Sequence, residues 1–350
     1  MSPRLHVVLG GGGVGKTTLA AGYALGLAAG GQRVGLLGVD PSRQLQRTLG
    51  VQLADLDAPL PGATNLRAAI VQPHQAVARW VAEGAPDAAA RLDRNPFFAA
   101  LGDRLATATD VIAAARIAEW VEGDPGLTDL VVDTAPGVAA IDVVRAPRLL
   151  SALVEGRLIR WLRAAAAVGD GRFRNVRFGA RRVLGGLASI AGAPMVLDLA
   201  EFFALVRAPL ERMLGRVERT RHWLASGEAD LLLVTSPRDT GGAAAREIDD
   251  ALRAEGLAPR AVIVNRTWPP TVAAELATLV APSGAEPFLA HARATLAAQA
   301  QVIAAVTTWA PALITLEAHP ALTLARRRAL AELGASLCRD LDPVATRSAS

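Results

Sequence analysis

The sequence predicts a doubly wound α/β fold, in which a mostly parallel sheet is covered by helices and carries a nested α-helical subdomain. Three observations favour this fold. Short, continuously apolar runs recur along the chain, and each ends in a polar or turn-forming residue. Ala- and Leu-rich stretches separate most of these runs, a pattern typical of parallel strands that are buried on both faces. The segment between Asp133 and Asp230 contains no convincing strand pattern, which indicates a helical insertion.

The predicted strands are apolar runs of five to seven residues. The first run ends in a glycine-rich loop, and an Ala/Leu-rich helix over residues 17–29 follows that loop. The strands are predicted over residues 5–9, 33–39, 65–71, 127–133, 230–235 and 260–265, with a weaker last strand over 311–316. In parallel sheets of this kind, ligands bind at the carboxyl ends of the strands.

The predicted helices define the domain organisation. Longer helical stretches are expected over residues 75–122, 147–168 and 181–224, the last with an interruption at 192–194. We therefore expect a core domain over residues 1–146 and 228–340, an α-helical insertion over 147–227 and a flexible tail over 341–350.

Composition excludes several classes of protein. The chain has 350 residues, of which 51% are hydrophobic and 4% aromatic, so it can bury a core built from Ala, Leu, Val and Ile. A single cysteine, Cys338, excludes a disulfide framework, a four-thiolate zinc or Fe–S site and a three-thiolate metalloid site within one chain. The net charge of +4 does not by itself indicate a nucleic-acid partner, and none is expected.

The same features favour a reducing, cytoplasmic environment. The residues before the glycine-rich loop leave no room for a signal peptide. A transmembrane helix needs about 20 apolar residues. The uncharged run over residues 183–197 is shorter than this and contains Pro194. We expect a cytoplasmic protein, with peripheral membrane association as an open alternative.

A phosphate-binding loop follows the first strand. Residues 10–17 read GGGGVGKT and fit the pattern G-x-x-x-x-G-K-[ST], whose backbone N–H groups surround a phosphate chain. Lys16 would contact the β and γ phosphates, and Thr17 would offer its hydroxyl to Mg²⁺. Lys16 is also the single lysine among 37 basic residues. Arginine cannot replace a compact ammonium group inside such a loop, so this lysine points to a phosphate ligand.

Other polar residues follow the strands that are predicted to neighbour this loop. Asp40 precedes Pro41, the sequence DTAP starts at Asp133, VTSP covers residues 234–237 and VNR covers residues 264–266. With these pieces and GGGGVGKTT, the sequence resembles the ArsA (arsenite-pump ATPase) family over nearly the whole chain. That family includes the ATPase that targets tail-anchored membrane proteins and bacterial relatives of unassigned role, which this sequence resembles most.

The resemblance implies an ATP hydrolase with a P-loop of the deviant Walker A type and with ATP and Mg²⁺ as ligands. It implies that Asn265 hydrogen-bonds the adenine and that Lys16, Asp40 and Asp133 form the catalytic set. Thr17 would bind the metal directly, with Asp133 and Asp40 in its outer shell, and Asp133 would begin a switch that continues to about Asp142. The triphosphate would be bound by Gly12, Gly13, Val14, Gly15, Lys16, Thr17 and Thr18.

The resemblance also implies a dimer, either of two copies or of this chain with a related ATPase. The insertion over residues 147–227 would change position with nucleotide state and bind a hydrophobic client or a membrane-associated partner. Its basic run over residues 157–182 is read either as a solvated helical face or as a surface for an acidic or membrane partner.

Three departures from the family pattern bear on hydrolysis. Gly11 stands where the deviant loop usually has a lysine that reaches across the dimer. Arg47 stands where the first switch usually has an aspartate that positions the attacking water. Residues 137–139 read Gly-Val-Ala and provide no side-chain donor after DTAP. The family's zinc-clamping CxxC and arsenite-binding thiolates are absent, so neither zinc nor arsenite is expected.

Several of these residues therefore have two alternative interpretations. Asp40 before Pro41 is either a turn former or an acid that orients water, and Asn265 is either a strand-end cap or an adenine ligand. Arg43 or Arg47 could act as the missing cross-dimer cation. Two functions follow: an active ATPase that moves a client or partner, or a hydrolysis-deficient subunit of a heterodimer with a related ATPase.

Overall fold

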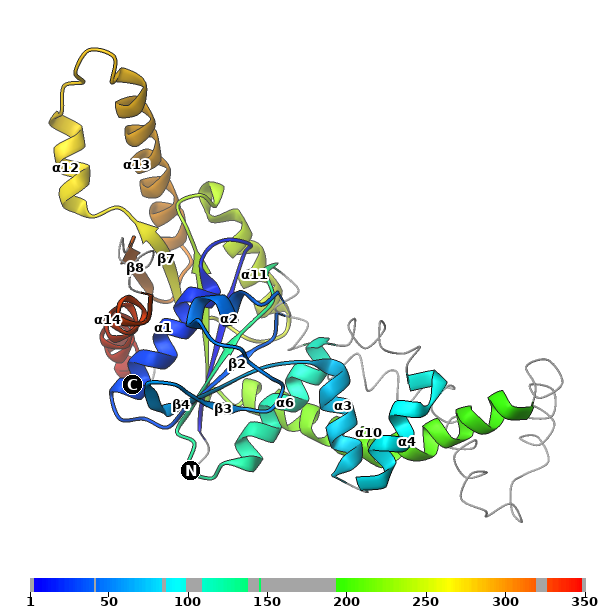
Figure 1. The fold of residues 1–350 in the computed structure, drawn as a ribbon. Coiled ribbons are helices and arrows are strands. Elements are labelled where there is room, and N and C mark those ends of the chain that lie inside the picture. Colours follow the sequence, from blue (N-terminus) through cyan, green and yellow to red (C-terminus); the bar gives the residue numbers. More distant parts are fainter. Residues whose placement is uncertain are drawn as a thin grey trace. The chain divides into compact units, whose positions relative to one another are not determined.

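The computed structural model describes residues 3–40, 42–83, 86–98, 109–137, 145, 193–318 and 326–347. Within these residues, eight strands form one sheet in the order β3-β4-β2-β5-β1-β6-β7-β8 (Figure 1). Neighbouring strands are parallel except for the edge pair β3 and β4, which is antiparallel. The predicted doubly wound, mostly parallel sheet is confirmed.

The strands match the apolar runs of the sequence to within a few residues. One strand was not predicted: β3 has only three residues and shows no periodic pattern. The strands are β1 (Arg4–Gly10), β2 (Val34–Gly38), β3 (Ala58–Leu60), β4 (Ala63–Ile70), β5 (Asp129–Asp133), β6 (Ala229–Thr235), β7 (Ala261–Thr267) and β8 (Leu313–Glu317).

The described helices lie between the strands and after the last one. The predicted flexible tail over 341–350 is corrected in part: residues 341–347 continue the last helix, in which Leu341 packs into the core. The helices are α1 (Lys16–Ala29), α2 (Gln44–Leu49), α3 (Pro73–Ala82), α4 (Pro86–Arg94), α6 (Thr109–Gly123), α10 (Ala193–Ala225), α11 (Ala243–Ala254), α12 (Pro270–Thr278), α13 (Glu286–Thr307) and α14 (Arg326–Arg347). A short 3₁₀ turn, η4 (Thr240–Gly242), precedes α11.

The central strands are apolar on both sides because helices cover both faces of the sheet. All five residues of β2 and of β5 are buried. Helix α1 packs against α14, and the two backbones approach very closely. A Cβ atom on Gly334 would lie 1.8 Å from the carbonyl oxygen of Gly22, so only glycine fits there. This contact fixes the position of α1, the helix that follows the phosphate-binding loop.

The chain divides into two compact units. One consists of Met1–Ile70, Trp120–Val144 and His222–Ser350, and the other of Val71–Glu119 and Arg145–Arg221. Residues 71–119 therefore group with the helical unit, whereas the sequence analysis placed them in the core domain. The reason is packing: Val81 and Leu92 from this segment share a hydrophobic cluster with Phe202 of α10. Residues 147–192 of the predicted insertion lie outside the described residues.

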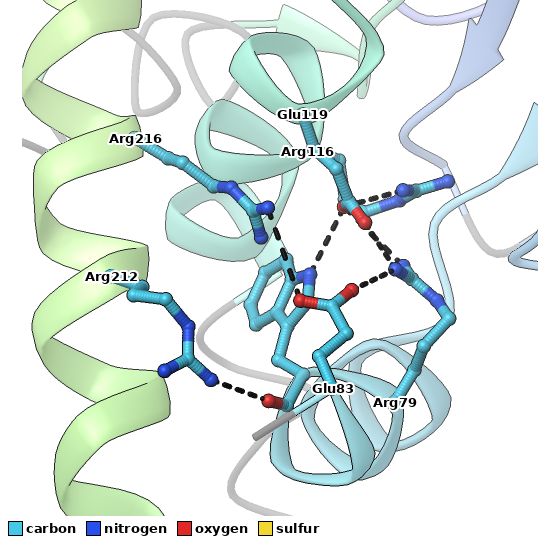
Figure 2. Close-up of polar contacts among 7 residues, drawn as sticks. Arg79, Glu83, Arg116, Glu119, Arg212 and Arg216 are labelled. Atoms are coloured by element: carbon cyan, nitrogen blue, oxygen red, sulfur yellow. Dashed lines mark hydrogen bonds and ion pairs between the residues drawn. The ribbon is translucent and has the colours of Figure 1, made fainter. Parts of the chain in front are cut away.

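The helical unit also contains a network of charged side chains (Figure 2). Glu119 of α6 accepts hydrogen bonds from Arg79 and Arg116 and, at 3.0 Å, from the indole N–H of Trp80. Burial would raise the pKa of Glu119, but Arg79 and Arg116 hold the pKa below its usual value. An ionised carboxylate with several donors is the arrangement that a buried charge requires.

Helix α10 contacts the same network through one of its faces. Arg212 donates to the carbonyl oxygen of Trp80 at 2.8 Å, and the Arg216 guanidinium lies 5.8 Å from the centre of the Trp80 ring (Figure 2). Two turns after Arg212, the hydroxyl of Thr220 donates to the carbonyl oxygen of Ala114 at 2.7 Å. Polar contacts at i, i+4 and i+8 thus join α10 to α3 and α6.

No helix in the described part of the chain combines the length and the apolar character that a membrane span requires.

Candidate functional site

The phosphate-binding loop connects the buried strand β1 to helix α1. Gly15 precedes the helix with a left-handed backbone (φ 98°), and a Cβ atom there would lie 2.4 Å from Asn265 Nδ2. At Gly12 and Gly13, by contrast, an added Cβ would meet no atom of the described residues within 4 Å, chain neighbours aside. The loop is thus closely packed on the side of Asn265 and open at its apex. The open side leaves room for a phosphate chain to approach the backbone N–H groups.

Lys16 begins α1 and folds back over the loop. Its Nζ donates to the carbonyl oxygen of Gly11 at 2.8 Å, and the side chain is buried. Burial lowers the pKa of Lys16, while the nearby carboxylates of Asp133 and Asp40 raise it. The ammonium group is therefore held by one carbonyl and by the field of two acids, and a phosphate chain would add the anion that this position favours.

Asp133 ends β5 next to the loop and is only 1% exposed. Burial raises its pKa to about 7, while a hydrogen bond from Thr17 and the charge of Lys16 oppose the rise. Its Oδ1 atom is buried and has no hydrogen-bond partner among the described residues. An orphaned carboxylate oxygen beside a threonine hydroxyl suits the oxygen-rich, partly hydrated shell of Mg²⁺. The residues present therefore fit the metal that the loop pattern implies.

Asp40 follows β2 and lies close enough to affect the pKa values of both Lys16 and Asp133. Its Oδ1 also accepts a hydrogen bond from the backbone N–H of Ser42 at 2.8 Å, which forms an Asx turn. Asp40 thus forms the turn that its position before Pro41 predicts. The turn orients its carboxylate next to Lys16 and Asp133. The structure brings Lys16, Thr17, Asp40 and Asp133 together from three parts of the sequence.

Two consecutive residues of β7 donate hydrogen bonds to backbone carbonyl oxygens of the phosphate-binding loop. Asn265 Nδ2 donates to the carbonyl oxygen of Val14 at 2.8 Å, and Arg266 donates to that of Gly13 at 3.0 Å. Arg266 has a positive φ of 63°, which is uncommon for a residue with a side chain, and it occupies an irregularity in the pairing of β7 with β8. The bulge allows neighbouring residues of one strand to contact the same loop.

The sequence reasoning missed Arg266 and Thr134. The position of Arg266 directly after Asn265 was visible in VNR, but its backbone conformation was not. Thr134 follows Asp133, is buried, and donates to the carbonyl oxygen of Val8 at 2.7 Å. It therefore ties the start of the predicted second switch to β1.

Some of the other residues that the sequence analysis singled out are described by the structure, and some are not. Thr18 lies in the first turn of α1, and Arg47 is exposed on α2. Arg43 precedes α2 with a left-handed backbone (φ 53°) and an exposed side chain. Residues 138–142 of the predicted second switch and the basic run over residues 157–182 lie outside the described residues.

The sequence was compared with protein families and with known proteins, and both comparisons found similarities. The profile of the ArsA family, described as anion-transporting ATPase, matches residues 4–179. A Streptomyces coelicolor protein described as uncharacterized is 31% identical over 277 residues, an alignment covering 76% of this chain. The chain spans 63% of the length of that relative.

Proposed function

Because the chain belongs to the ArsA family of anion-transporting ATPases, we propose that it binds and hydrolyses Mg-ATP and couples the nucleotide state to the position of its helical unit. The observation that carries the proposal is the group formed by Lys16, Thr17 and Asp133 around the open apex of the phosphate-binding loop. A lysine, a hydroxyl and a buried acid beside free backbone amides are the parts that phosphoryl transfer uses.

Each side chain has a distinct task in this proposal. The amides of the loop and the Lys16 ammonium bind the β and γ phosphates. The Thr17 hydroxyl and Asp133 hold Mg²⁺, which would supply charge neutralisation of the phosphates when bound. Asp40, next to both Lys16 and Asp133, is the acid that orients the attacking water. Its Asx turn with Ser42 holds the carboxylate in place for that task.

Asn265 selects the base. Its Nδ2 group donates to the Val14 carbonyl oxygen, which fixes the orientation of the amide and leaves Oδ1 as its acceptor for a ligand. An acceptor in this position favours the exocyclic amino group of adenine and disfavours the carbonyl oxygen of guanine. The orientation of the amide thus supports ATP over GTP.

In this proposal the helical unit is the part of the chain that responds to nucleotide binding. Nucleotide binding would shift the population of its positions, provided that the two states bind ATP with different affinity. The unit would bind a hydrophobic client or a membrane-associated partner, and the protein would act in the cytoplasm as a homodimer or a heterodimer. The division of the chain into two units supports this separation of nucleotide and partner sites.

A second function is favoured by two particular residues. Gly11 lacks the side chain that would reach across a dimer, and Arg47 replaces the acid that positions water. A subunit with these residues would bind ATP and depend on a related ATPase for turnover. The same loop, metal site and base site would serve both functions, so binding alone does not separate them.

Steady-state phosphate release separates the two functions. The full chain is assayed alone and mixed with a related ATPase from the same genome, with Lys16→Ala as the inactive variant and the exposed Arg339→Ala as the matched control. Turnover by the chain alone that Lys16→Ala abolishes supports the active ATPase. Turnover only in the mixture supports the heterodimer subunit. ATP binding that Lys16→Ala leaves unchanged would falsify both functions.

A further inference from the structure

A hollow of about 600 Å³ lies beside the phosphate-binding loop and is distinct from its apex. Its walls come from residues 236–238 after β6, from Arg266 and Trp268 at the end of β7, and from one face of α13 between His291 and Gln299. Residues 11–18 of the loop and its first helical turn do not line it. A volume of this size holds a small organic molecule, and a polypeptide segment would occupy more space.

The ionisable side chains that line the hollow are all basic. Arg238, Arg266 and His291 line it, and its lining contains no aspartate or glutamate. Within the described residues, neither arginine forms an ion pair and the ring of His291 has no polar partner. Two guanidinium groups and an imidazole around one concave surface, without a compensating carboxylate, favour an anion.

The floor of the hollow is apolar and held in place. Trp268 and, from α13, Ala294 and Ala298 are among the residues that line it. Gln299 fixes the backbone of Trp268 from both sides: its Oε1 accepts from the Trp268 N–H at 2.7 Å, and its Nε2 donates to the Trp268 carbonyl oxygen at 3.1 Å. An aromatic side chain on a fixed backbone beside cations suits a ligand that has both an apolar body and an anionic group.

Arg266 connects the hollow to the phosphate-binding loop. One end of its guanidinium donates to the Gly13 carbonyl oxygen, while the same side chain lines the hollow. Its positive φ is a costly conformation that the surrounding structure must maintain, and such conformations often mark functional positions. A ligand that attracts this guanidinium would act directly on a residue that holds the loop.

We propose that the hollow binds a small organic anion, whose apolar body packs on Trp268 and whose carboxylate, phosphate or sulfonate group contacts Arg238 and Arg266. Through Arg266, occupancy of the hollow changes the affinity of the loop for nucleotide. Linkage requires that nucleotide changes the affinity for the anion by the same factor. The linkage rests on the proposed ATP site, whereas binding of the anion does not.

Fluorescence titration of the full chain tests the site without nucleotide. The probe is 8-anilinonaphthalene-1-sulfonate, and the uncharged N-phenyl-1-naphthylamine is its control. We expect saturable one-site binding of the sulfonate that is at least fivefold weaker in Arg238→Gln and unchanged in Arg339→Gln. The side chain of Arg238 is exposed and forms no hydrogen bond or ion pair with described residues, so we expect its replacement to leave the fold intact. Equal affinity for both probes, or unchanged binding in both Arg238→Gln and His291→Gln, overturns the site.

The linkage is tested by repeating the titration with Mg²⁺ and a saturating unhydrolysable ATP analogue. We expect the Kd of the sulfonate to change at least threefold, and this change to disappear in Arg266→Gln. An unchanged Kd, when a fluorescent ATP analogue is shown to bind, overturns the linkage. Absence of nucleotide binding instead contradicts the proposed function, because the titration without nucleotide still decides whether the hollow binds the anion.

Discussion

His6 and Asp129 face each other inside the sheet, with Nε2 of the imidazole 2.9 Å from the carboxylate Oδ1. The other ring nitrogen, Nδ1, lies 3.1 Å from Asp230 Oδ2. His6 lies in β1, Asp129 in β5 and Asp230 in β6. One buried side chain therefore ties the central strand to both neighbours.

This relationship predicts a loss of stability in acid. Burial would raise the pKa of Asp230, but hydrogen bonds from His6 and Arg260 lower it to about 2. A lowered pKa contributes stability that is present above the unfolded value, near 4, and is lost as the pH falls toward 2. The expected contribution is on the order of 2 kcal/mol. Urea unfolding between pH 2 and pH 7 measures it. In Asp230→Asn the free energy of unfolding should be lower at pH 7 and should fall less between pH 7 and pH 2 than in the unsubstituted protein. An equal fall in both proteins would contradict the lowered pKa of Asp230.

The network around Glu119 predicts a large effect of one substitution in the helical unit. Glu119→Gln removes the charge that receives Arg79, Arg116 and the Trp80 indole, and so breaks the ion pairs of Glu119 with the two arginines. Breaking a buried ion pair costs about 3–5 kcal/mol. The control Glu83→Gln alters a more exposed carboxylate, 39% exposed, and should cost less than about 1 kcal/mol. Thermal unfolding of both variants measures the difference, and equal losses would argue against the central role of Glu119.

The phosphate-binding loop predicts that Gly15 tolerates no side chain. Gly15→Ala combines a left-handed backbone with a Cβ atom that collides with Asn265. Strain of this kind costs about 1–3 kcal/mol, so the Kd for a fluorescent ATP analogue should rise roughly 5- to 100-fold. Gly31→Ala is a matched control, because Gly31 has a similar φ of 95° with open space around it. Similar losses of nucleotide binding in both variants would show that the contact with Asn265 is unimportant.

Asn265 predicts base selectivity. Asn265→Asp replaces the amide that donates to Val14 with an acceptor, which the carbonyl oxygen repels. Losing one buried hydrogen bond costs about 1–3 kcal/mol, so ATP should bind roughly 5- to 150-fold more weakly. The preference for ATP over GTP should be kept, because an aspartate oxygen still accepts a hydrogen bond from the adenine amino group. Competition titrations with ATP and GTP measure both effects. The exposed Asn65→Asp serves as the control, and loss of the ATP preference in Asn265→Asp would exclude the side-chain acceptor of residue 265 as the base-selecting group.

Gly11 predicts a gain of function. An added Cβ at this position would meet its nearest neighbours, Ala244 and Val14, at 3.7 Å, an ordinary contact distance. A lysine therefore fits, and Gly11→Lys should raise phosphate release in a manner that depends on protein concentration, as expected for a cation that acts across a dimer. Gly11→Met has a similar length without the charge and should leave turnover unchanged. Equal turnover in the two variants would show that the missing cation does not limit hydrolysis.

The local parts of the fold could be predicted from the sequence. The apolar runs identified the central strands, since each run is continuous and short enough to be a buried strand. Strand β3 was missed because three residues carry no periodic pattern. The boundary of the helical unit was misplaced, because residues 71–119 have the same helical pattern whether they cover a sheet or pack against α10.

The sequence by itself determined the phosphate-binding loop of this protein, because all of its residues are contiguous and the spacing of glycine, lysine and threonine sets the local chemistry. Only the tertiary structure decided which distant side chains complete the loop. Asn265 and Arg266 reach it from about 250 positions away in the chain. Such contacts depend on strand order and on a bulge that redirects one arginine, and neither property is encoded in a local pattern.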